Sequence, residues 1–490
     1  MATSAATPTT PASRDPQSPS TDPNPGNSSS QGSAPSTKPW LTLALLCLTQ
    51  LMLVLDITGV NVALPAIGAG LRLGRADLTW VLTAYTVAFG GLMLLGGRLA
   101  DQFGARRTLL TGLSVFTVAS AVSGLAGTGA VLIAGRVAQG IGAALLSPAA
   151  LALVTTMFDA SKRSKALGIW AAVGGSGAAI GVAVGGLLTS EAGWRWVFFI
   201  NLPIGLAVLA TLPVLVAAGP ARHRRALDLP GALIVVAATG AAIYGLISAG
   251  SDGWLTARAL IPIAAAIAGY LLFGWRERTA AAPLMQVRLL TTRAVGVGAF
   301  LMLVATSLLV GGFFLGSFYL QQVRGYSAVH TGLAFLPLAA AIILGAQAGG
   351  HLATALDRRV LTTGALTLAA IGEAAAAHWH GPVALIAGLS VASAGIGAAL
   401  VAATTTALAD TPPAEAGLRS GVVNTFHELG SALGVAVLSS LAAPSLTGIS
   451  LTGFSRAFGA CALAALAAAL IAAVLAPAGR AAAGATPHGH

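Results

Sequence analysis

The chain has 490 residues, of which 56% are hydrophobic and only 8% are charged, and its formal net charge is +11. Soluble domains carry about 25% charged residues, so this composition excludes a soluble protein and indicates an integral membrane protein with many spans. The positive charge does not indicate nucleic-acid binding, because the basic residues are scattered through short loops and are not gathered on one face.

Two polar tails are predicted at the ends of the chain. Residues 1–39 are rich in Ser, Thr, Pro, Asn and Gln and contain no apolar run, so we expect a disordered cytoplasmic tail without a cleavable signal peptide. Residues 477–490 are predicted to form a second disordered cytoplasmic tail. The cysteines, Cys47 and Cys461, both lie in apolar stretches and are predicted to be small core residues, with neither a disulfide nor a metal site.

Between the tails, apolar stretches of about 20 residues recur, which is the length that an α-helix needs to cross a bilayer. About 14 spans are predicted, and an even number places both tails on one side of the membrane. With both tails cytoplasmic, roughly 19 of the 26 Lys and Arg residues fall in inward segments, as the positive-inside rule requires. The predicted helices begin near Trp40, Thr79, Thr108, Gly129, Ala166, Arg195, Leu229, Ala257, Ala294, Ala328, Val360, Pro382, Arg419 and Leu451.

An internal repeat divides the spans into two halves. The run GGHLATALDRRVLTTGAL, which begins at Gly349, repeats the run GGRLADQFGARRTLLTGL, which begins at Gly96. Each run follows the second helix of a six-helix block, so we predict an N-terminal six-helix bundle at residues 40–218 and a C-terminal six-helix bundle at residues 294–476. Residues 219–293 are predicted to form a linker with two additional transmembrane helices. Duplicated halves with a site between them are the usual construction of secondary transporters.

The first of these runs is a short basic turn between two apolar helices. It resembles the signature loop between the second and third helices of the major facilitator superfamily, and it matches that loop at Gly97, Leu99, Ala100, Asp101, Gly104, Arg106 and Arg107. The resemblance implies that Asp101 gates the conformational change by helping to lock the two halves together. Gln102 and Ala105 replace basic residues that are common in the family, which weakens the charge network. The alternative is a loop that its arginines merely hold on the cytoplasmic side.

Three acidic residues, Asp56, Glu373 and Glu428, fall inside predicted helices. A carboxylate at mid-membrane costs at least about 2.5 kcal/mol, so each is a candidate functional residue. A carboxyl group that binds either a proton or a cationic substrate would couple export to the proton gradient. The alternative is a snorkelling residue or a structural pair near a membrane boundary. For Glu373, which is close to His378 and His380 near a predicted outer end, both interpretations stay open.

Two helix motifs carry the candidate coupling residues. Asp56 lies in LDITGVNVALP, which resembles a first-helix signature of the fourteen-helix drug:proton antiporters. Thr58 and Asn61 of this stretch are candidate cavity residues, or they simply hydrogen-bond to neighbouring helices. Arg136 lies in AGRVAQGIGAA, which resembles the fourth-helix motif whose arginine is associated with proton transfer. Alternatively, Arg136 reaches backbone carbonyls or the outer interface.

The fifth predicted helix contains Gly177, Gly181, Gly185 and Gly186, which resemble the antiporter motif of the superfamily. Val182 replaces the proline of that motif, a departure that bears on antiport and not on the fold. The alternative is that these glycines are close-packing sites.

Three further stretches resemble the fourteen-helix branch: Gly193–Gly205, Phe318–Pro337 and Ala416–Ala436. Tyr319, Gln321 and Gln322 in the second stretch are candidate cavity residues, as is Glu373, with packing as the alternative. In the third stretch, His427 and Glu428 stand where Arg and Gln are commoner, so Glu428 is expected to set the charge preference for substrate or to bind a proton.

These patterns predict an all-α integral membrane protein with the major facilitator fold, in which two inserted helices accompany two six-helix bundles. The resemblance implies a proton-coupled antiporter that exports amphipathic drugs, antibiotics or toxic metabolites across the plasma membrane by alternating access, with Asp56, Glu428 and Arg136 as coupling residues. The alternatives are a dedicated exporter of one endogenous metabolite and a non-antiport carrier of the same superfamily.

We expect no enzyme activity, cofactor, metal or ATP requirement, because no HExxH, Ser/His/Asp or GxxxxGK[S/T] pattern is found in the sequence. The proton gradient is the expected energy source. The expected partners are small amphipathic substrates, protons and membrane lipids, without nucleic acid, and the protein is expected to be a monomer with both termini cytoplasmic.

Overall fold

The computed structural model describes residues 38–158, 160–217, 228–281, 283–285, 287–378, 381–409, 416–446 and 451–479, and every regular element in these ranges is helical. Most of both predicted tails lies outside the described residues. Helices follow from the sequence because a bilayer offers the backbone no hydrogen-bond partners, so each apolar stretch must satisfy its own N–H and C=O groups.

Twelve helices among the described residues are long and apolar enough to cross a membrane. Two more long helices pack beside them, α3 against α4 and α5 against α1, in agreement with the prediction of about 14 spans. The first half comprises α1 (Pro39–Leu71), α2 (Arg75–Phe103), α3 (Ala105–Gly124), α4 (Gly129–Met157), α5 (Ala160–Glu191), and α6 (Trp196–Phe199) with α7 (Asn201–Leu215) as the sixth span. The inserted pair is α8 (Leu229–Asp252) and α9 (Ala257–Thr279), and the short α10 (Val287–Thr291) follows it. The second half comprises α11 (Arg293–Phe318), the π-helical turn η1 (Tyr319–Val323), α12 (Ala328–Ala355), α13 (Arg358–His378), α14 (Pro382–Ala407), α15 (Ala416–Leu441), α16 (Ala443–Leu446) and α17 (Thr452–Leu475).

The two halves repeat the same packing. In the first half α4 packs against both α2 and α3, and in the second half α14 packs against both α12 and α13. Glycines make the corresponding contacts close, because Gly96 of α2 has only a hydrogen where a side chain would overlap the backbone of Ala144, and Gly345 of α12 does the same against Ala394. The fold class predicted from the sequence is therefore confirmed: two six-helix bundles with an inserted helix pair.

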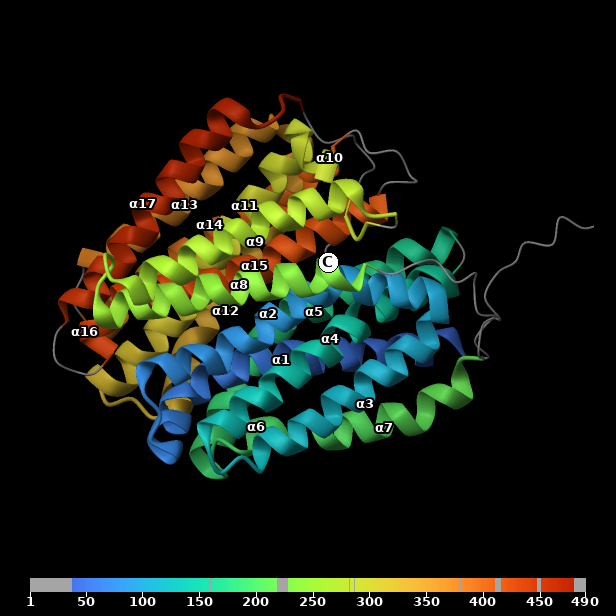
Figure 1. The fold of residues 1–490 in the computed structure, drawn as a ribbon, viewed down its shortest axis with the longest axis horizontal. Helices are drawn as coiled ribbons and strands as arrows, with labels where there is room; N and C mark the ends of the chain where they lie inside the picture. The colour runs from blue at the N-terminus through green and yellow to red at the C-terminus, as the bar shows by residue number, and fades with distance from the viewer. Residues whose placement is uncertain are drawn as a thin grey trace, which may run out of the picture. The chain divides into compact units, whose positions relative to one another are not determined.

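The inserted pair packs where the two halves meet. Helix α8 contacts α2 of the first half and α15 of the second half, and α9 packs on α8 (Figure 1). Asp228 fixes the start of α8 by accepting a hydrogen bond from the Gly231 N–H at 3.1 Å and by pairing with Arg276 of α9 at 2.9 Å. The inserted helices thus bridge the two halves through α2 and α15.

Hydrogen bonds between the halves gather at one end of the helices, the end where α1 finishes and α2 begins, which we call the closed end. Ser317 donates to the Asn61 carbonyl at 3.1 Å, and Gln321 donates to the Val62 carbonyl at 2.8 Å. On the neighbouring helices, Ser190 of α5 accepts from the Val329 N–H of α12 at 2.9 Å. The side-chain and backbone groups that join the halves therefore hold this end shut.

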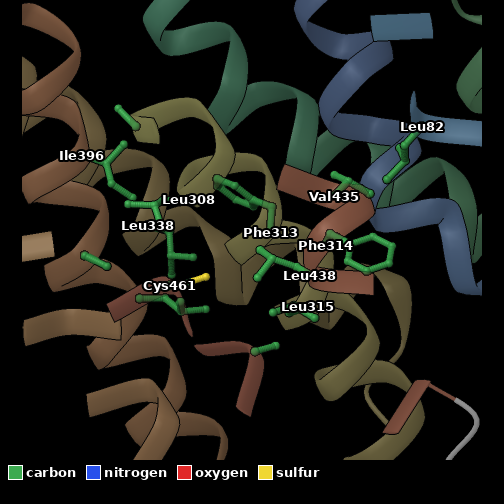
Figure 2. Close-up of a cluster of buried hydrophobic side chains, with 14 of the residues drawn as sticks. Leu82, Leu308, Phe313, Phe314, Leu315, Leu338, Ile396, Val435, Leu438 and Cys461 are labelled. Atoms are coloured by element: carbon green, nitrogen blue, oxygen red, sulfur yellow. The ribbon is translucent and has the colours of Figure 1, made fainter. Parts of the chain in front are cut away.

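Apolar packing continues from the closed end into the second half. Phe313, Phe314 and Leu315 of α11 belong to one buried cluster together with Leu82 of α2 and Val435 of α15 (Figure 2). Because this cluster includes residues of both halves, apolar side chains contribute to the interface at this depth.

Candidate functional site

Asp56 lies at the centre of a buried hydrogen-bond network inside the first half. Its carboxylate forms an ion pair with the Arg136 guanidinium of α4. The same carboxylate accepts hydrogen bonds from Gln139 Nε2 at 2.9 Å and Asn201 Nδ2 at 3.0 Å. Asp56, Gln139 and Asn201 are each 0% exposed. Three donors around one carboxylate stabilise its charged form in the protein interior.

Arg136 is held on every side. Its Nε donates to the Val81 carbonyl of α2 at 3.0 Å, and its Nη1 also donates to Gln139 Oε1 at 2.9 Å. The guanidinium carbon lies 4.4 Å from the centre of the Tyr85 ring, which is cation–π distance. The backbone contact that the sequence left open as an alternative is therefore present, together with the ion pair.

The sequence did not single out two of the polar residues in this network. Asn201 is the first residue of α7, directly after the break between α6 and α7, and Ser120 of α3 accepts from Gln139 Nε2 at 2.8 Å and from Asn201 Nδ2 at 3.3 Å. An amide two residues before a proline in an apolar stretch is a signal that could have pointed to Asn201. Ser120 is one of three serines in α3, with nothing in the sequence to distinguish it from Ser114 and Ser123, so its role was not predictable.

A small cavity lies between the two halves and next to this network. Arg136 is part of its wall, whereas Asp56 stands behind Arg136 and does not line it. The lining combines apolar side chains with hydroxyl and amide groups, and it comes from α1, α2 and α4 of the first half and from α11 and α15 of the second half. The lining residues are Ile57, Asn61, Leu82, Thr83, Tyr85, Thr86, Arg136, Val310, Ser431 and Val435.

Two of these lining residues carry buried polar atoms without a partner. The Tyr85 hydroxyl and the Asn61 side-chain oxygen each lack a hydrogen bond in the structure. Such groups are costly unless a ligand or water satisfies them. They are therefore the atoms of this cavity with unused capacity to bind a polar group.

Glu428 lies on α15, one helical turn before the cavity residue Ser431, and is 6% exposed. It packs directly on α2 of the other half, because a side chain at Gly90 would overlap the Glu428 Cβ. Its carboxylate lies 3.2 Å from Nδ1 of its neighbour His427, whose side chain is 38% exposed. Glu428 is thus a buried acid at the interface of the halves, with a titratable partner that reaches more open surroundings.

Glu373 does not lie in the cavity between the halves. It is 1% exposed and lines a second small cavity inside the second half, among residues of α11, α12 and α14. Its Oε2 has no hydrogen-bond partner. The predicted neighbour His380 is outside the described residues, and His378 is exposed, with its Nδ1 2.9 Å from the Ala374 carbonyl of its own helix.

The other candidate cavity residues point elsewhere. Thr58 donates to the Val54 carbonyl of its own helix at 2.7 Å and packs against Gly181 of α5. Tyr319 makes an edge contact with Phe454 of α17, with ring centres 5.6 Å apart, and Gln322 is exposed. Asn61 is the one of these candidates that lines the cavity between the halves.

The signature loop lies between α2 and α3. Gly104 adopts φ +90°, a left-handed conformation that glycine tolerates without strain, and this allows α3 to begin directly after α2. Arg106 donates to the Pro213 carbonyl of α7 at 3.1 Å, while Asp101 and Arg107 are exposed. Gly97 has open space around it, with Pro148 as its nearest neighbour. The gating role of Asp101 remains a prediction.

The predicted antiporter-type glycines all make close helix contacts. Gly177 packs on Val54, Gly181 on Thr58 and Gly185 on Gly59, so these three bring α5 against α1. Gly186 faces the other way and packs on the backbone of Ala328 in α12 of the second half. These glycines therefore set the approach of α5 to both halves, and α5 runs from Ala160 to Glu191 without a proline.

Two repeated halves, with a cavity between them and a buried ion pair inside the first half beside it, form the architecture of a secondary transporter. Residues 46–435 match the family described as Major Facilitator Superfamily. The chain belongs to the major facilitator superfamily and is a multi-pass membrane transporter.

Characterised relatives cover most of the chain. It is 38% identical to the puromycin resistance protein pur8 of Streptomyces alboniger over 83% of this chain and 82% of that protein. It is 35% identical to the tetracenomycin C resistance and export protein of Streptomyces glaucescens, over 83% of this chain and 76% of that protein. It is 34% identical to the multidrug resistance protein Stp of Mycobacterium tuberculosis, over 82% of this chain and 76% of that protein.

Solved structures share the fold. A bacterial homologue of the human lysosomal transporter Spinster is similar with a TM-score of 0.64 and 17% identity, over 90% of this chain and 96% of that one. An auto-inhibited POT family peptide transporter is similar with a TM-score of 0.67 and 17% identity, over 92% of this chain and all of the other.

Proposed function

We propose that the protein is a proton-coupled antiporter of the plasma membrane that exports amphipathic small molecules of the antibiotic type. The observation that carries the proposal is the cavity between the halves: Arg136 forms part of its wall with Asp56 paired behind it, and Glu428 lies one helical turn from the lining residue Ser431. The relatives whose names denote resistance to or export of antibiotics support the same substrate class.

The cavity lining fits an amphipathic ligand. Leu82, Val310 and Val435 offer apolar contact, while the Tyr85 hydroxyl and the Asn61 amide oxygen have free hydrogen-bonding capacity. Pockets with mostly apolar walls and a few placed polar groups are typical small-molecule sites. The cavity has room for about one water molecule in this conformation, so substrate binding would require the halves to separate at one end.

Glu428 is the group best placed to exchange a proton for substrate. It is nearly buried at the interface of the halves, so movement of the halves would expose its side chain to solvent. A cationic group of the substrate would stabilise the Glu428 carboxylate, whereas without substrate a bound proton would neutralise it. Competition between the two ligands for one carboxyl group couples export to the proton gradient.

The Asp56–Arg136 pair would serve as the second coupling element. Asp56 fixes Arg136 at the cavity wall, so a proton on Asp56 would weaken the ion pair and release the guanidinium toward the cavity. Arg136 would thus change its position at the cavity wall when Asp56 binds a proton, and so couple protonation of Asp56 to substrate binding.

The hydrogen bonds at the closed end suggest how the protein would alternate between its two open states. With both termini cytoplasmic, the closed end faces outward, and substrate would enter from the cytoplasm once the halves separate at the opposite end. Rocking of the halves around the cavity would break the bonds of Ser317 and Gln321 and open the outer side. The Asp101 loop lies at the opposite end, where it would hold the halves together in the outward-open state. We propose a monomer driven by the proton gradient alone, without ATP.

A dedicated exporter of one endogenous metabolite is the second candidate. It is favoured by relatives whose names refer to a single antibiotic each, such as puromycin or tetracenomycin C, whereas Stp is named for multidrug resistance. A panel of structurally unrelated antibiotics separates the two, because a dedicated exporter moves one chemical class only.

The test is transport into liposomes that contain the purified protein and carry an imposed pH gradient. Substrate should accumulate against its gradient while protons move the other way, and Glu428→Gln should reduce gradient-driven accumulation by about tenfold or more. Glu191→Gln, which removes an exposed acid at the end of α5, is the matched control and should transport normally. Normal proton-driven accumulation by Glu428→Gln would refute the assignment.

A further inference from the structure

Each half buries an acid within its own bundle, Asp56 in the first and Glu373 in the second, but with opposite surroundings. Counted from the Arg pair of each repeated run, Glu373 on α13 falls within one residue of the position that Ser120 holds on α3. In the first half, Ser120 belongs to the network in which Arg136 and Gln139 of α4 hold the Asp56 carboxylate. Glu373 of the second half therefore lies in the repeat-related environment of that network.

The residues that neutralise Asp56 have apolar counterparts around Glu373. Counted from the first residue of each helix, Leu389 and Ala392 hold the same positions on α14 that Arg136 and Gln139 hold on α4. Both Leu389 and Ala392 line the cavity into which Glu373 projects. Where the first half supplies a guanidinium and an amide, the second half supplies two hydrocarbon side chains.

No cation faces Glu373 from the helices around it. The cavity residues, all of them described, contain no Lys, Arg or His, and Ser393 is the only one besides Glu373 with a polar side chain. The thiol of Cys461 on α17 is a titratable group near this cavity, since Figure 2 places Cys461 in the same cluster as the cavity residues Leu308, Leu338 and Ile396. Helix α14 has no ionisable residue, and the basic residues of α11, α12, α13 and α17 lie at their ends or outside this cavity.

An ionised carboxylate in such surroundings would be a buried charge without compensation, so the neutral acid is the form that the geometry accepts. We propose that Glu373 is a second proton-binding site of the transporter, separate from the Asp56 network and from Glu428, and that it holds a proton while the closed end is shut. The proposal rests on the proposed function of proton-coupled transport.

Helix α11 gives Glu373 a route to the central cavity. Val310 of α11 lines the cavity between the halves, while Leu309 and Gly312 line the Glu373 cavity, so the same helix separates the two. The wall is thin at Gly312, where an added Cβ would lie 3.9 Å from Glu373 Oε1. The π-helical turn η1 follows α11 directly and carries Gln321, which bonds across the closed end. Such turns are common at functional sites, and opening of this end would move α11 and admit water to Glu373.

The first experiment measures the proton directly. Infrared spectra of the full-length protein in lipid at neutral pH should contain the C=O band of a protonated carboxyl group. The difference spectrum between wild type and Glu373→Gln should show that this band is lost in the variant. Ser393→Ala, a control from the same cavity, should retain the band. If Glu373→Gln does not fold, Glu373→Asp keeps the acid and should shift the band. Absence of the band from the wild type, or its persistence unchanged in Glu373→Gln, overturns the proposal.

The second experiment counts protons in transport. In proteoliposomes Glu373→Gln should exchange one proton fewer per substrate than the wild type, while exchange of substrate across the membrane without a pH gradient continues. An unchanged proton-to-substrate ratio overturns the coupling role of Glu373. If the wild type moves no substrate at all, the proposed function fails, and the infrared band alone decides whether Glu373 binds a proton.

Discussion

The Asp56–Arg136 ion pair offers the sharpest test of how the first half is built. Asp56→Asn and Arg136→Met each remove one charge, and the double variant removes both. In Asp56→Asn one amide oxygen must replace a carboxylate that accepts from three donors, so at least one donor loses its acceptor. In Arg136→Met the Asp56 carboxylate keeps only the amide donors of Gln139 and Asn201.

The expected loss of folding free energy depends on which buried groups each variant leaves without a partner. Removal of one partner of a buried ion pair costs about 3–5 kcal/mol of folding free energy. Asp56→Asn should fall near 3 kcal/mol, roughly the lower end, because Arg136 keeps the Val81 carbonyl and the Tyr85 ring. Arg136→Met should fall near the upper end, about 5 kcal/mol. The double variant leaves no uncompensated charge and should cost about 5 kcal/mol in total, which gives a coupling energy of about 3 kcal/mol.

The assay is denaturant-induced unfolding in lipid–detergent micelles, followed by circular dichroism for the wild type, both single variants and the double variant. Arg456→Met is the matched control, since Arg456 is exposed on α17, and its effect should stay within about 0.5 kcal/mol. If the costs of the single variants simply add in the double variant, the two residues are not energetically coupled and the reasoning fails.

Three further predictions concern the closed end, the loop between α12 and α13 that contains Asp357, and the glycine contacts. Gln321→Ala removes a bond across the closed end worth about 1 kcal/mol, so the open population should rise about fivefold, and spin-label distances between the ends of α5 and α12 should report it; unchanged distances would contradict the gate. Backbone hydrogen bonds from Gly479 and Arg359 lower the pKa of Asp357 below its ordinary value of 3.8, so its hold on the Gly479 amide is complete above pH 3.8 and is lost as pH falls through the lowered pKa. Asp357→Asn should therefore speed exchange of the Gly479 amide at neutral pH and match the wild type in strong acid; equal rates at neutral pH would contradict this contact. Gly185→Ala should cost about 1–3 kcal/mol because its new methyl would meet the backbone of α1, whereas Gly274→Ala, with open space around it, should be neutral in the same unfolding assay; equal effects of the two would contradict close packing at Gly185.

The helices were predictable from the sequence because a bilayer allows few solutions. A stretch of about 20 apolar residues must form a helix to satisfy its backbone, and the starts at Gly129, Leu229, Ala257, Ala328 and Pro382 agree with the prediction to the residue. The repeated glycine-rich runs also predicted the division into two halves, since both copies lie after the second helix of a block.

The facing of side chains was not predictable, because lipid and protein interior are both apolar. Glu373 lies in the run AAIGEAAAAH, in which small apolar residues cover every side of the helix, so no amphipathic pattern shows which side meets protein. The structure turns Glu373 into the second half, away from the cavity that Asn61 and Arg136 line. The assembly of Asp56 with Ser120 and Asn201 also depends on three distant helices meeting, which spacing along the chain does not encode.

The central claim is that substrate and proton compete at the interface of the halves. Addition of a transported antibiotic to purified protein in weakly buffered micelles should release protons, which a pH-sensitive dye detects. Glu428→Gln should bind the antibiotic and release fewer protons, while Glu191→Gln should match the wild type. Undiminished proton release from Glu428→Gln at equal substrate binding would contradict the account.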